Sequence, residues 1–225
     1  MTIRRAPSAC SSEKTAPFGS TLTVGATLSG APAGSLLSFD AGQGAVFVTT
    51  DSSGHASAAL SLSGSVGTQH VTVSYAGDVG HLASSARSSD FTVTKASTAL
   101  AFSVTNKKVD VPPGTAKPKL PLVNIGTSLV ATLTTGSRPL PQKAVLYSLT
   151  NVLSKKTVLI ARTTDLNGRA PLGIVQLVPG VYQVTAAFGL AGAGTAVDPD
   201  YASSSIQWIV ALIAGLPTVR AATPH

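Results

Sequence analysis

The 225-residue sequence has a single cysteine, Cys10, so no disulfide can form within the chain. It is therefore not a small secreted domain held together by disulfides. Cys10 lies in a serine-rich start and is not expected to be catalytic. Charged residues make up only 11% of the chain, against about a quarter in typical soluble domains. Glutamate occurs once, at Glu13, and this shortage of strong helix formers favours an all-β chain rich in β-branched residues.

Long apolar runs are also missing. The segment Ile206–Leu216 is far short of the roughly 20 residues that a membrane helix needs, so no membrane insertion is expected. Met1–Arg5 has the charge of a signal-peptide start, but no apolar stretch follows it. The chain is then either cytoplasmic or a piece of a longer exported protein. The repeat described below favours the second alternative and predicts an extracellular or cell-surface location.

The net charge of +7 is unevenly distributed. Residues 15–95 carry two basic and four acidic side chains, a net charge of −2, whereas residues 96–211 carry ten basic and four acidic ones, a net charge of +6. The basic half could favour an anionic surface such as a cell-wall polymer or nucleic acid. Alternatively, these charges only keep a weakly charged β protein soluble. No aromatic residues interleave with the lysines, as single-stranded nucleic acid would require.

Apolar and polar residues alternate with a period of two in several segments, which predicts strands with one buried and one solvated face. These segments are residues 21–28, 57–62, 70–75 and 182–188. Asp51–Gly54 and Asp165–Gly168 fit type I turns, with aspartate first and glycine last. No stretch shows sustained helical periodicity. About seven short strands in roughly 100 residues are what a two-sheet sandwich requires.

Several patterns occur twice in the same order, which predicts two tandem domains. The matched pairs are Gly19–Leu22 with Gly126–Leu129, Asp51–Gly54 with Asp165–Gly168, Val71–Tyr75 with Val184–Phe188, and Leu82–Ser85 with Tyr201–Ser204. The offset between copies rises along the chain, as loop insertions in the second copy would produce. One insertion is visible, because Leu190–Asp200 replaces the shorter Ala76–His81.

The repeat predicts four parts of the chain. They are a disordered N-terminal segment (1–16), a first domain (17–95), a second domain (96–212) and a flexible C-terminal tail (213–225). No obvious strand precedes Phe18, so the first domain is expected to lack its first strand. The junction Lys95–Thr98 is short and limits any hinge. Asn106–Pro121, with four prolines, is expected to be an extended basic loop of the second domain.

The phrases Val71–Asp78, Leu82–Ser85 and Phe91–Lys95 together resemble bacterial immunoglobulin-like repeat domains. Such repeats have tyrosine-x-glycine-aspartate, then small and serine residues, then a last strand ending in threonine and lysine. The resemblance covers about Pro17 to Val210. It implies two tandem immunoglobulin-like antiparallel β-sandwich domains, an extracellular location in tandem arrays, and a role as spacer or adhesion module. These motifs mark a fold and not a chemistry.

Motifs of catalysis are missing from the sequence. It contains no nucleophile elbow, phosphate loop, dinucleotide fingerprint or paired-histidine zinc motif. The histidines do not share metal-ligand spacing; they are His55, His70, His81 and His225. His70 lies on a polar strand face and is expected to be solvated. His55 lies beside Asp51, where an Asp–His pair is conceivable, but no motif places a nucleophile there. We therefore predict no enzyme and no catalytic, cofactor-binding or metal-binding residue.

Two further features have a structural and a functional interpretation. Asp198 and Asp200 could supply oxygen ligands to calcium, but calcium usually takes six or more, so a simple polar turn is favoured. Trp208 could stack on a sugar. Since the chain has few aromatic residues, a core or inter-sheet position for this ring is favoured.

The sequence thus favours a non-catalytic structural or adhesion module of a bacterial secreted or cell-surface protein, acting as a spacer or stalk beside neighbouring domains of a longer chain. The alternative is a carbohydrate- or cell-wall-binding accessory module of a secreted enzyme, with recognition by the loops Asn106–Pro121 and Leu190–Asp200. A cytoplasmic DNA-associated protein is suggested only by the isoelectric point of 9.8. Neither a nucleic-acid partner nor a cofactor is expected.

Overall fold

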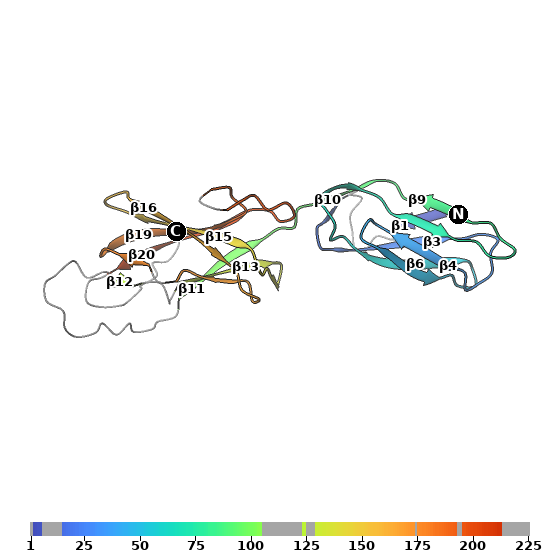
Figure 1. Cartoon of the computed structure of the whole chain (residues 1–225), viewed down its shortest axis with the longest axis horizontal. Coiled ribbons are helices and arrows are strands. Elements are labelled where there is room, and N and C mark those ends of the chain that lie inside the picture. The colour runs from blue at the N-terminus through green and yellow to red at the C-terminus, as the bar shows by residue number, and fades with distance from the viewer. Residues whose placement is uncertain are drawn as a thin grey trace. The chain divides into compact units, whose positions relative to one another are not determined.

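Among the residues that the computed structural model describes, every regular element is a β-strand, which confirms the all-β class (Figure 1). The structure describes residues 2–5, 15–104, 123–124, 129–173, 175–192 and 195–212. The chain divides into two compact parts, Met1–Ala96 and Ser97–His225, called unit 1 and unit 2 below. None of the described segments forms a helix with the length and hydropathy to span a bilayer.

Unit 1 is built from short strands. They are β1 (Thr2–Arg5), β2 (Thr15–Pro17), β3 (Thr21–Thr27), β4 (Leu36–Asp40), β5 (Ala45–Thr49), β6 (His55–Ser61), β7 (Gly67–Gln69), β8 (Thr72–Tyr75), β9 (Ser84–Arg87) and β10 (Phe91–Thr94). One sheet has the order β1-β3-β6 and another the order β5-β4-β8-β9. A third ladder, β2-β10-β7, involves the chain that leads into β8 and out of β9.

Unit 2 repeats this order, and the strands of its four-stranded sheet are longer than those of unit 1. The strands of unit 2 are β11 (Ala99–Val104), β12 (Val123–Asn124), β13 (Leu129–Thr135), β14 (Arg138–Pro139), β15 (Ala144–Asn151), β16 (Thr157–Thr163), β17 (Arg169–Pro171), β18 (Gln176–Leu177), β19 (Gly180–Phe188) and β20 (Ser204–Leu212). β13 pairs with β11 and with β14 and β17, while β16-β15-β19-β20 form the larger sheet. Both units therefore combine a sheet centred on β3 or β13 with a four-stranded sheet of matching strand order.

The two predicted aspartate turns close in the same way. The Gly54 amide donates to the Asp51 carbonyl at 3.0 Å, and the Gly168 amide donates to the Asp165 carbonyl at 2.9 Å. Gly54 and Gly168 have φ values of 74° and 70°, in the left-handed region that glycine adopts without strain. A Cβ atom at either position would overlap a carbonyl oxygen of the preceding long strand segment, at Leu28 or Leu133 respectively. Each turn therefore requires glycine for two separate reasons.

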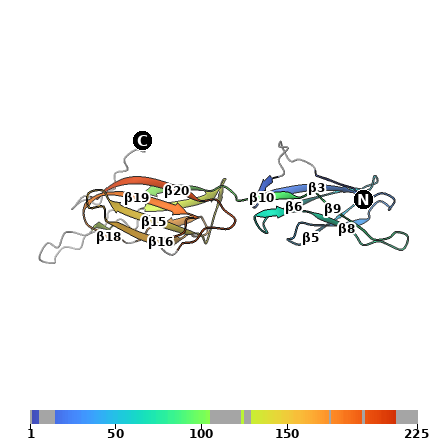
Figure 2. The ribbon, with the colours of Figure 1, turned by 90° about the horizontal axis from the view of Figure 1, so that it is seen from above.

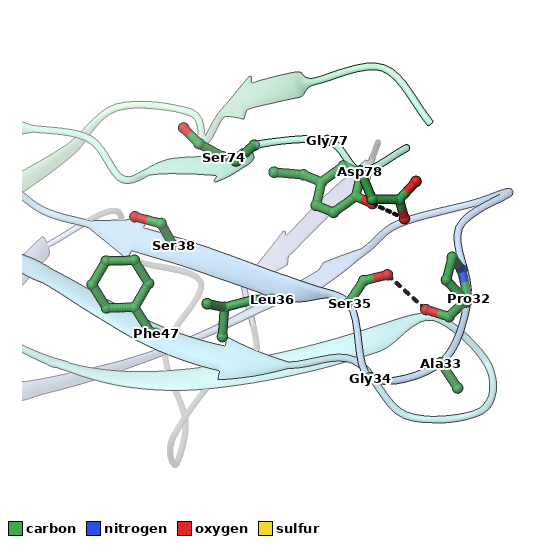
Figure 3. A pocket seen from close by; sticks show the side chains of 12 residues that line it. Pro32, Ala33, Gly34, Ser35, Leu36, Ser38, Phe47, Ser74, Gly77 and Asp78 are labelled. Atoms are coloured by element: carbon green, nitrogen blue, oxygen red, sulfur yellow. Dashed lines mark hydrogen bonds between the residues drawn. The ribbon is translucent and has the colours of Figure 1, made fainter. Parts of the chain in front are cut away.

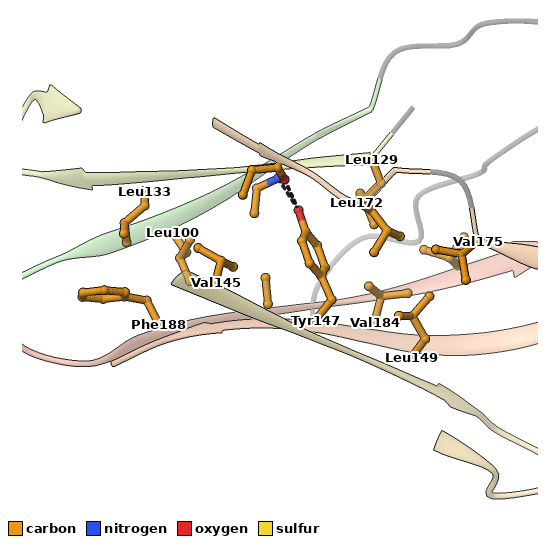
Figure 4. Close-up of a cluster of buried hydrophobic side chains, with 14 of the residues drawn as sticks. Leu100, Leu129, Leu133, Val145, Tyr147, Leu149, Leu172, Val175, Val184 and Phe188 are labelled. Carbon is orange, nitrogen blue, oxygen red and sulfur yellow. Dashed lines mark hydrogen bonds between the residues drawn. The ribbon is translucent and has the colours of Figure 1, made fainter. Parts of the chain in front are cut away.

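Figure 2 shows the strands of each unit in a second view, among them β3 and β6 in unit 1 and β15 and β19 in unit 2. Each unit has its own hydrophobic core. In unit 1 buried side chains of β3 and β6 meet those of β4 and β8, including Phe39 and Val73. In unit 2 the cluster around Tyr147 combines residues of β13 and β17 with residues of β15 and β19 (Figure 4). Strand β6 alternates exposed and buried residues without exception, as its period of two predicts. Each fully buried leucine, valine or phenylalanine contributes about 1.5–3 kcal/mol by leaving water.

The Tyr147 hydroxyl joins the two sheets of unit 2. It accepts a hydrogen bond from the Ala131 amide at 2.8 Å and donates one to the Ala170 carbonyl (Figure 4). Ala131 and Ala170 face each other in the β13–β17 ladder, so the side chain from β15 satisfies both backbone groups at once. Burial raises the pKa of Tyr147 to about 12. Phe39 holds the corresponding position in unit 1, since its partner Val73 matches Ala186, the partner of Tyr147.

A second shared hydrogen bond lies just before β8 in unit 1 and at the start of β19 in unit 2. The Tyr182 hydroxyl donates to the Val178 carbonyl at 3.0 Å, four residues upstream. In unit 1 the Gln69 side-chain amide donates to the Ser65 carbonyl, also four residues upstream. Gln69 and Tyr182 stand 113 positions apart, the same offset that relates Val71–Tyr75 to Val184–Phe188. Different side chains thus make the same bond to the carbonyl four residues upstream in both units. It is called the corner bond below.

The start of unit 1 differs from the sequence prediction. Residues 1–16 were expected to be disordered and the first strand to be missing, but β1 pairs with β3 and β2 pairs with β10. These strands have only four and three residues, too few for a period-of-two pattern to stand out. The β2–β10 pair is also parallel, whereas the sequence predicted antiparallel sheets throughout. Cys10 lies outside the described residues.

The link between the units is short in sequence, because β10 ends at Thr94 and β11 begins at Ala99. The loop of unit 2 between β19 and β20 is longer than its counterpart between β8 and β9, as the repeat predicts. The predicted basic loop Asn106–Pro121 and the predicted tail 213–225 with His225 lie outside the residues that the structure describes.

Candidate functional site

A groove of about 530 Å³ lies on unit 1, where the outer face of the four-stranded sheet meets two loops (Figure 3). The loop before β4 and the loop after β8 form its end. Its lining residues are Pro32, Ala33, Gly34, Ser35, Leu36, Ser38, Phe47, Ser74, Tyr75, Ala76, Gly77 and Asp78. The volume falls in the range of about 300–1,000 Å³ that is usual for ligand sites.

Strand alternation places the apolar part of the groove. Leu37 and Phe39 of β4 point into the core, so Leu36 and Ser38 point outward. Phe47 of β5 faces Ser38 across the ladder and lies on the same outer face. Phe47 is 63% exposed and Leu36 is 53% exposed. Together they give the groove an uncovered hydrophobic wall.

Asp78 forms the polar end of the groove. One of its carboxylate oxygens accepts the Tyr75 hydroxyl at 2.7 Å, and the other accepts the Gly80 amide at 2.8 Å and contacts Nδ1 of His81 at 2.7 Å. Gly77 makes the turn possible with a φ of 85°, and a Cβ there would lie 2.8 Å from the Ala83 nitrogen. The contacts of Asp78 with Tyr75, Gly80 and His81 therefore hold the loop after β8 in one conformation. This set of contacts is called the loop lock below.

These contacts keep Asp78 ionised. The hydrogen bond from Tyr75, followed by those from His81 and Gly80, lowers the pKa of Asp78 to about 2. The folded-state pKa lies below the unfolded value, so the loop lock contributes fully above about pH 4 and weakens as the pH falls through about 2. At neutral pH the groove thus carries a fixed negative charge.

A titration of Asp78 tests this lock. Changing Tyr75 to phenylalanine removes the first of the stabilising donors, so we expect the pKa of Asp78 to rise from about 2 toward its usual value near 3.8. The side-chain carboxyl carbon, followed by NMR against pH, reports the shift directly. Tyr182→Phe, in unit 2, is the control and should leave the Asp78 titration unchanged. If the pKa of Asp78 were unchanged in Tyr75→Phe, the Tyr75 hydroxyl would not be a donor that stabilises this carboxylate.

Asp78 and the Ser35 hydroxyl of the groove are held by hydrogen bonds to neighbouring residues of unit 1. Of the hydroxyls in the groove, the Ser35 hydroxyl donates to the Pro32 carbonyl at 2.7 Å. In the described part of the chain, no hydrogen bond joins a serine hydroxyl to a histidine ring, as an activated serine would require. Asp78 has a lowered pKa, whereas a carboxyl acting as a general acid near neutral pH needs a raised one.

Of the singled-out histidines that the structure describes, His55 and His70 are exposed and His81 is half-buried. His70 is exposed, as predicted, and lines a smaller polar hollow of about 340 Å³ together with Asp40, Gln43 and Gln69. The conceivable Asp51–His55 pair does not form through the ring: Asp51 accepts the His55 backbone amide, and the ring contacts Thr27. The Asp–His contact occurs instead at Asp78 and His81, which the sequence analysis did not connect.

Asp198, one of the two aspartates for which the sequence favoured a polar turn over a calcium site, is held by hydrogen bonds and an ion pair. One Asp198 oxygen accepts the amides of Asp200 and Tyr201 at 3.0 Å, and the other lies 2.7 Å from Nζ of Lys143. Burial opposes ionisation, but these hydrogen bonds prevail and lower the pKa of Asp198. The Lys143 ammonium also lies 4.7 Å from the Tyr201 ring centre. The Lys143 ammonium thus pairs with the carboxylate oxygen that a metal ion would use. The described residues contain no cluster of three metal-ligating side chains.

Trp208 packs against the core of unit 2, the position that the sequence favoured over a sugar-binding one. Its ring packs on the unit 2 core and meets Phe102 edge to face, with ring centres 5.2 Å apart. Phe102 comes from β11 and Trp208 from β20, so the contact joins the two sheets rather than offering an open sugar platform. Comparison of the chain with known protein families and with curated proteins gives no match.

Proposed function

We propose that the chain is a pair of tandem immunoglobulin-like β-sandwich domains that act as a non-catalytic spacer or stalk in a bacterial secreted or cell-surface protein. The observation that carries this proposal is the repeated strand order, β1-β3-β6 with β5-β4-β8-β9, and β11-β13-β17 with β16-β15-β19-β20. Neighbouring domains of a longer surface protein are the partners that such a module implies.

Two details support the immunoglobulin-like assignment. Each unit packs a sheet centred on β3 or β13 against a four-stranded sheet around a single core, which is the two-sheet architecture of immunoglobulin-like sandwiches. The edge strand β5 or β16 pairs with the strand before it, so the strand order differs from that of constant-type domains. The hydrogen bond from Tyr182 to the carbonyl four residues upstream corresponds to the tyrosine corner of that fold. Gln69 makes the same link in unit 1.

The terminal strands of unit 1 support a load-bearing role. β2 and β10, near the start and the end of the unit, pair in parallel over three residues. The Phe18 amide extends this ladder by donating to the Thr94 carbonyl at 2.8 Å. Tension applied along the chain pulls these two strands in opposite directions, so their hydrogen bonds are loaded together in shear. A spacer under tension benefits from that arrangement.

Single-molecule stretching of the full chain tests the spacer proposal. We expect two separate unfolding events with contour-length gains of about 25 nm and about 35 nm, from residues 15–94 and 99–212 at full extension. Ala16→Pro removes a backbone N–H from β2 and should lower the force of the shorter event only. Unit 2 in the same molecule is the internal control. Extension without resolved events would contradict a load-bearing role.

The alternative function is a carbohydrate- or cell-wall-binding accessory module. The exposed Phe47 ring in the unit 1 groove is the observation that favours it, because an aromatic face can stack on a sugar. Retention on isolated cell-wall polysaccharide at low salt would support this alternative, and elution in the void volume would remove it.

A further inference from the structure

We propose that the unit 1 groove binds a basic side chain of a partner protein, with the aliphatic stem on Leu36 and Phe47 and the charged head at Asp78. The spacer role assigns no ligand to this face, so the inference goes beyond it. The proposed site uses the outward surface of β4 and β5 together with the loop after β8. This binding proposal does not depend on whether the chain bears load.

The apolar half of the groove matches a long, unbranched stem. Leu36 and Phe47 lie on adjacent strands and expose 53% and 63% of their surface. Lysine and arginine side chains cover apolar surface with their methylene groups while their charged ends stay hydrated. A guanidinium also packs favourably over an aromatic face such as that of Phe47, by about 0.5–1 kcal/mol at an exposed site.

The polar half of the groove selects a positive charge. Asp78 is the one charged residue among the described residues that line the groove. Its three neighbours Tyr75, Gly80 and His81 fix the carboxylate in place. A carboxylate offers about four acceptor sites, so a ligand N–H can still reach it. Unit 1 as a whole has five basic and five acidic side chains and therefore no formal net charge, so Asp78 is the charge that favours a cation in the groove.

A neutral glycan fits this surface less well. Sugar recognition needs several convergent donors and acceptors around an aromatic platform, and here the Ser35 hydroxyl is already bonded within its own loop. Tyr75, the other aromatic residue in the lining, is buried and directs its hydroxyl to Asp78. An anionic cell-wall polymer is disfavoured by the fixed carboxylate. The groove therefore favours a cation with an apolar stem.

The test compares two blocked tripeptides on the full chain by NMR titration at pH 8 and low salt. One carries arginine between two glycines, and the other carries citrulline, which has the same shape and no charge. We expect the arginine peptide to shift the backbone signals of Leu36, Phe47 and Asp78 and to bind at least fivefold more tightly than the citrulline peptide. Raising the salt to 200 mM should weaken the arginine peptide and leave the citrulline peptide unchanged.

Two variants make the outcome decisive. Phe47→Ala removes the exposed ring and should weaken the arginine peptide at least fivefold; Leu36→Ser provides a second, independent change on the same wall. The matched control is Leu82→Ala, whose side chain is 93% exposed and lies outside the groove. Equal binding of both peptides, full binding by Phe47→Ala, or tighter binding of a neutral oligosaccharide than of the arginine peptide would each overturn the proposal.

Discussion

Replacing Gly168 with alanine should destabilise unit 2 by about 2–5 kcal/mol. The added Cβ costs about 1–2 kcal/mol in the left-handed conformation and about 1–3 kcal/mol more through its overlap with the Leu133 carbonyl. The overlapped atom is backbone, which cannot turn away as a side chain can. Urea unfolding followed by the fluorescence of Trp208, the single tryptophan, reports on unit 2 alone.

The control for this prediction is Gly136→Ala. Gly136 also has a positive φ, at 55°, but a Cβ there meets no atom within 4 Å. We expect it to lose only the conformational part, about 1–2 kcal/mol. Gly54→Ala should reproduce the full loss in unit 1 and leave the Trp208 transition in place. If Gly136→Ala and Gly168→Ala lowered the free energy of unfolding equally, a Cβ at position 168 would not overlap the Leu133 carbonyl.

Replacing Tyr147 with phenylalanine should destabilise unit 2 by about 1–3 kcal/mol. The change removes one hydroxyl and with it the buried hydrogen bonds to the Ala131 amide and the Ala170 carbonyl. The ring itself stays, so packing against Phe102 and the core is preserved. The same Trp208-detected urea transition measures the loss, and the slope of the transition should not change.

Tyr182→Phe is the comparison for this second prediction. It also removes one hydroxyl bonded to a backbone carbonyl, but that bond is only partly buried and involves one partner. We expect a loss of about 0.5–1.5 kcal/mol. If Tyr147→Phe were neutral, the backbone groups of β13 and β17 would have to pair directly without the hydroxyl, and the sheets would not be tied through Tyr147.

The sequence predicted those parts of the fold where period-of-two alternation runs over six or more residues. Segments 21–28, 57–62 and 182–188 became β3, β6 and β19, with their apolar residues in the core. The two aspartate turns were also predicted, since aspartate and glycine at fixed spacing have a local physical cause. Local rules of this kind need no knowledge of the rest of the chain.

Short and edge strands could not be predicted in the same way. β1 and β2 have too few residues to show a pattern, and their pairing depends on partners that are distant in sequence, β3 and β10. β5 is mostly exposed on both faces, so its apolar residues carry no alternation. The Gln69 and Tyr182 corner bonds were missed because two unlike side chains perform the same task.

The sequence indicated only one part of the candidate site. The Tyr75–Asp78 phrase was noted as a mark of a fold, but its link to His81 needs the turn geometry at Gly77. The groove also needs Phe47, which the β4–β5 ladder brings beside Ser38. In the same way Lys143 and Asp198 are 55 positions apart, and their ion pair could not be inferred from local spacing.

The central claim, that two units repeat one strand order around separate cores, is tested most directly by cross-strand NMR contacts in the full chain. We expect close backbone protons between Ala26 and Ala56 and between their counterparts Ala131 and Ala170. We also expect the parallel contact between Ala16 and Val93. A different strand order in the two halves, or one ladder running continuously through both, would contradict the claim.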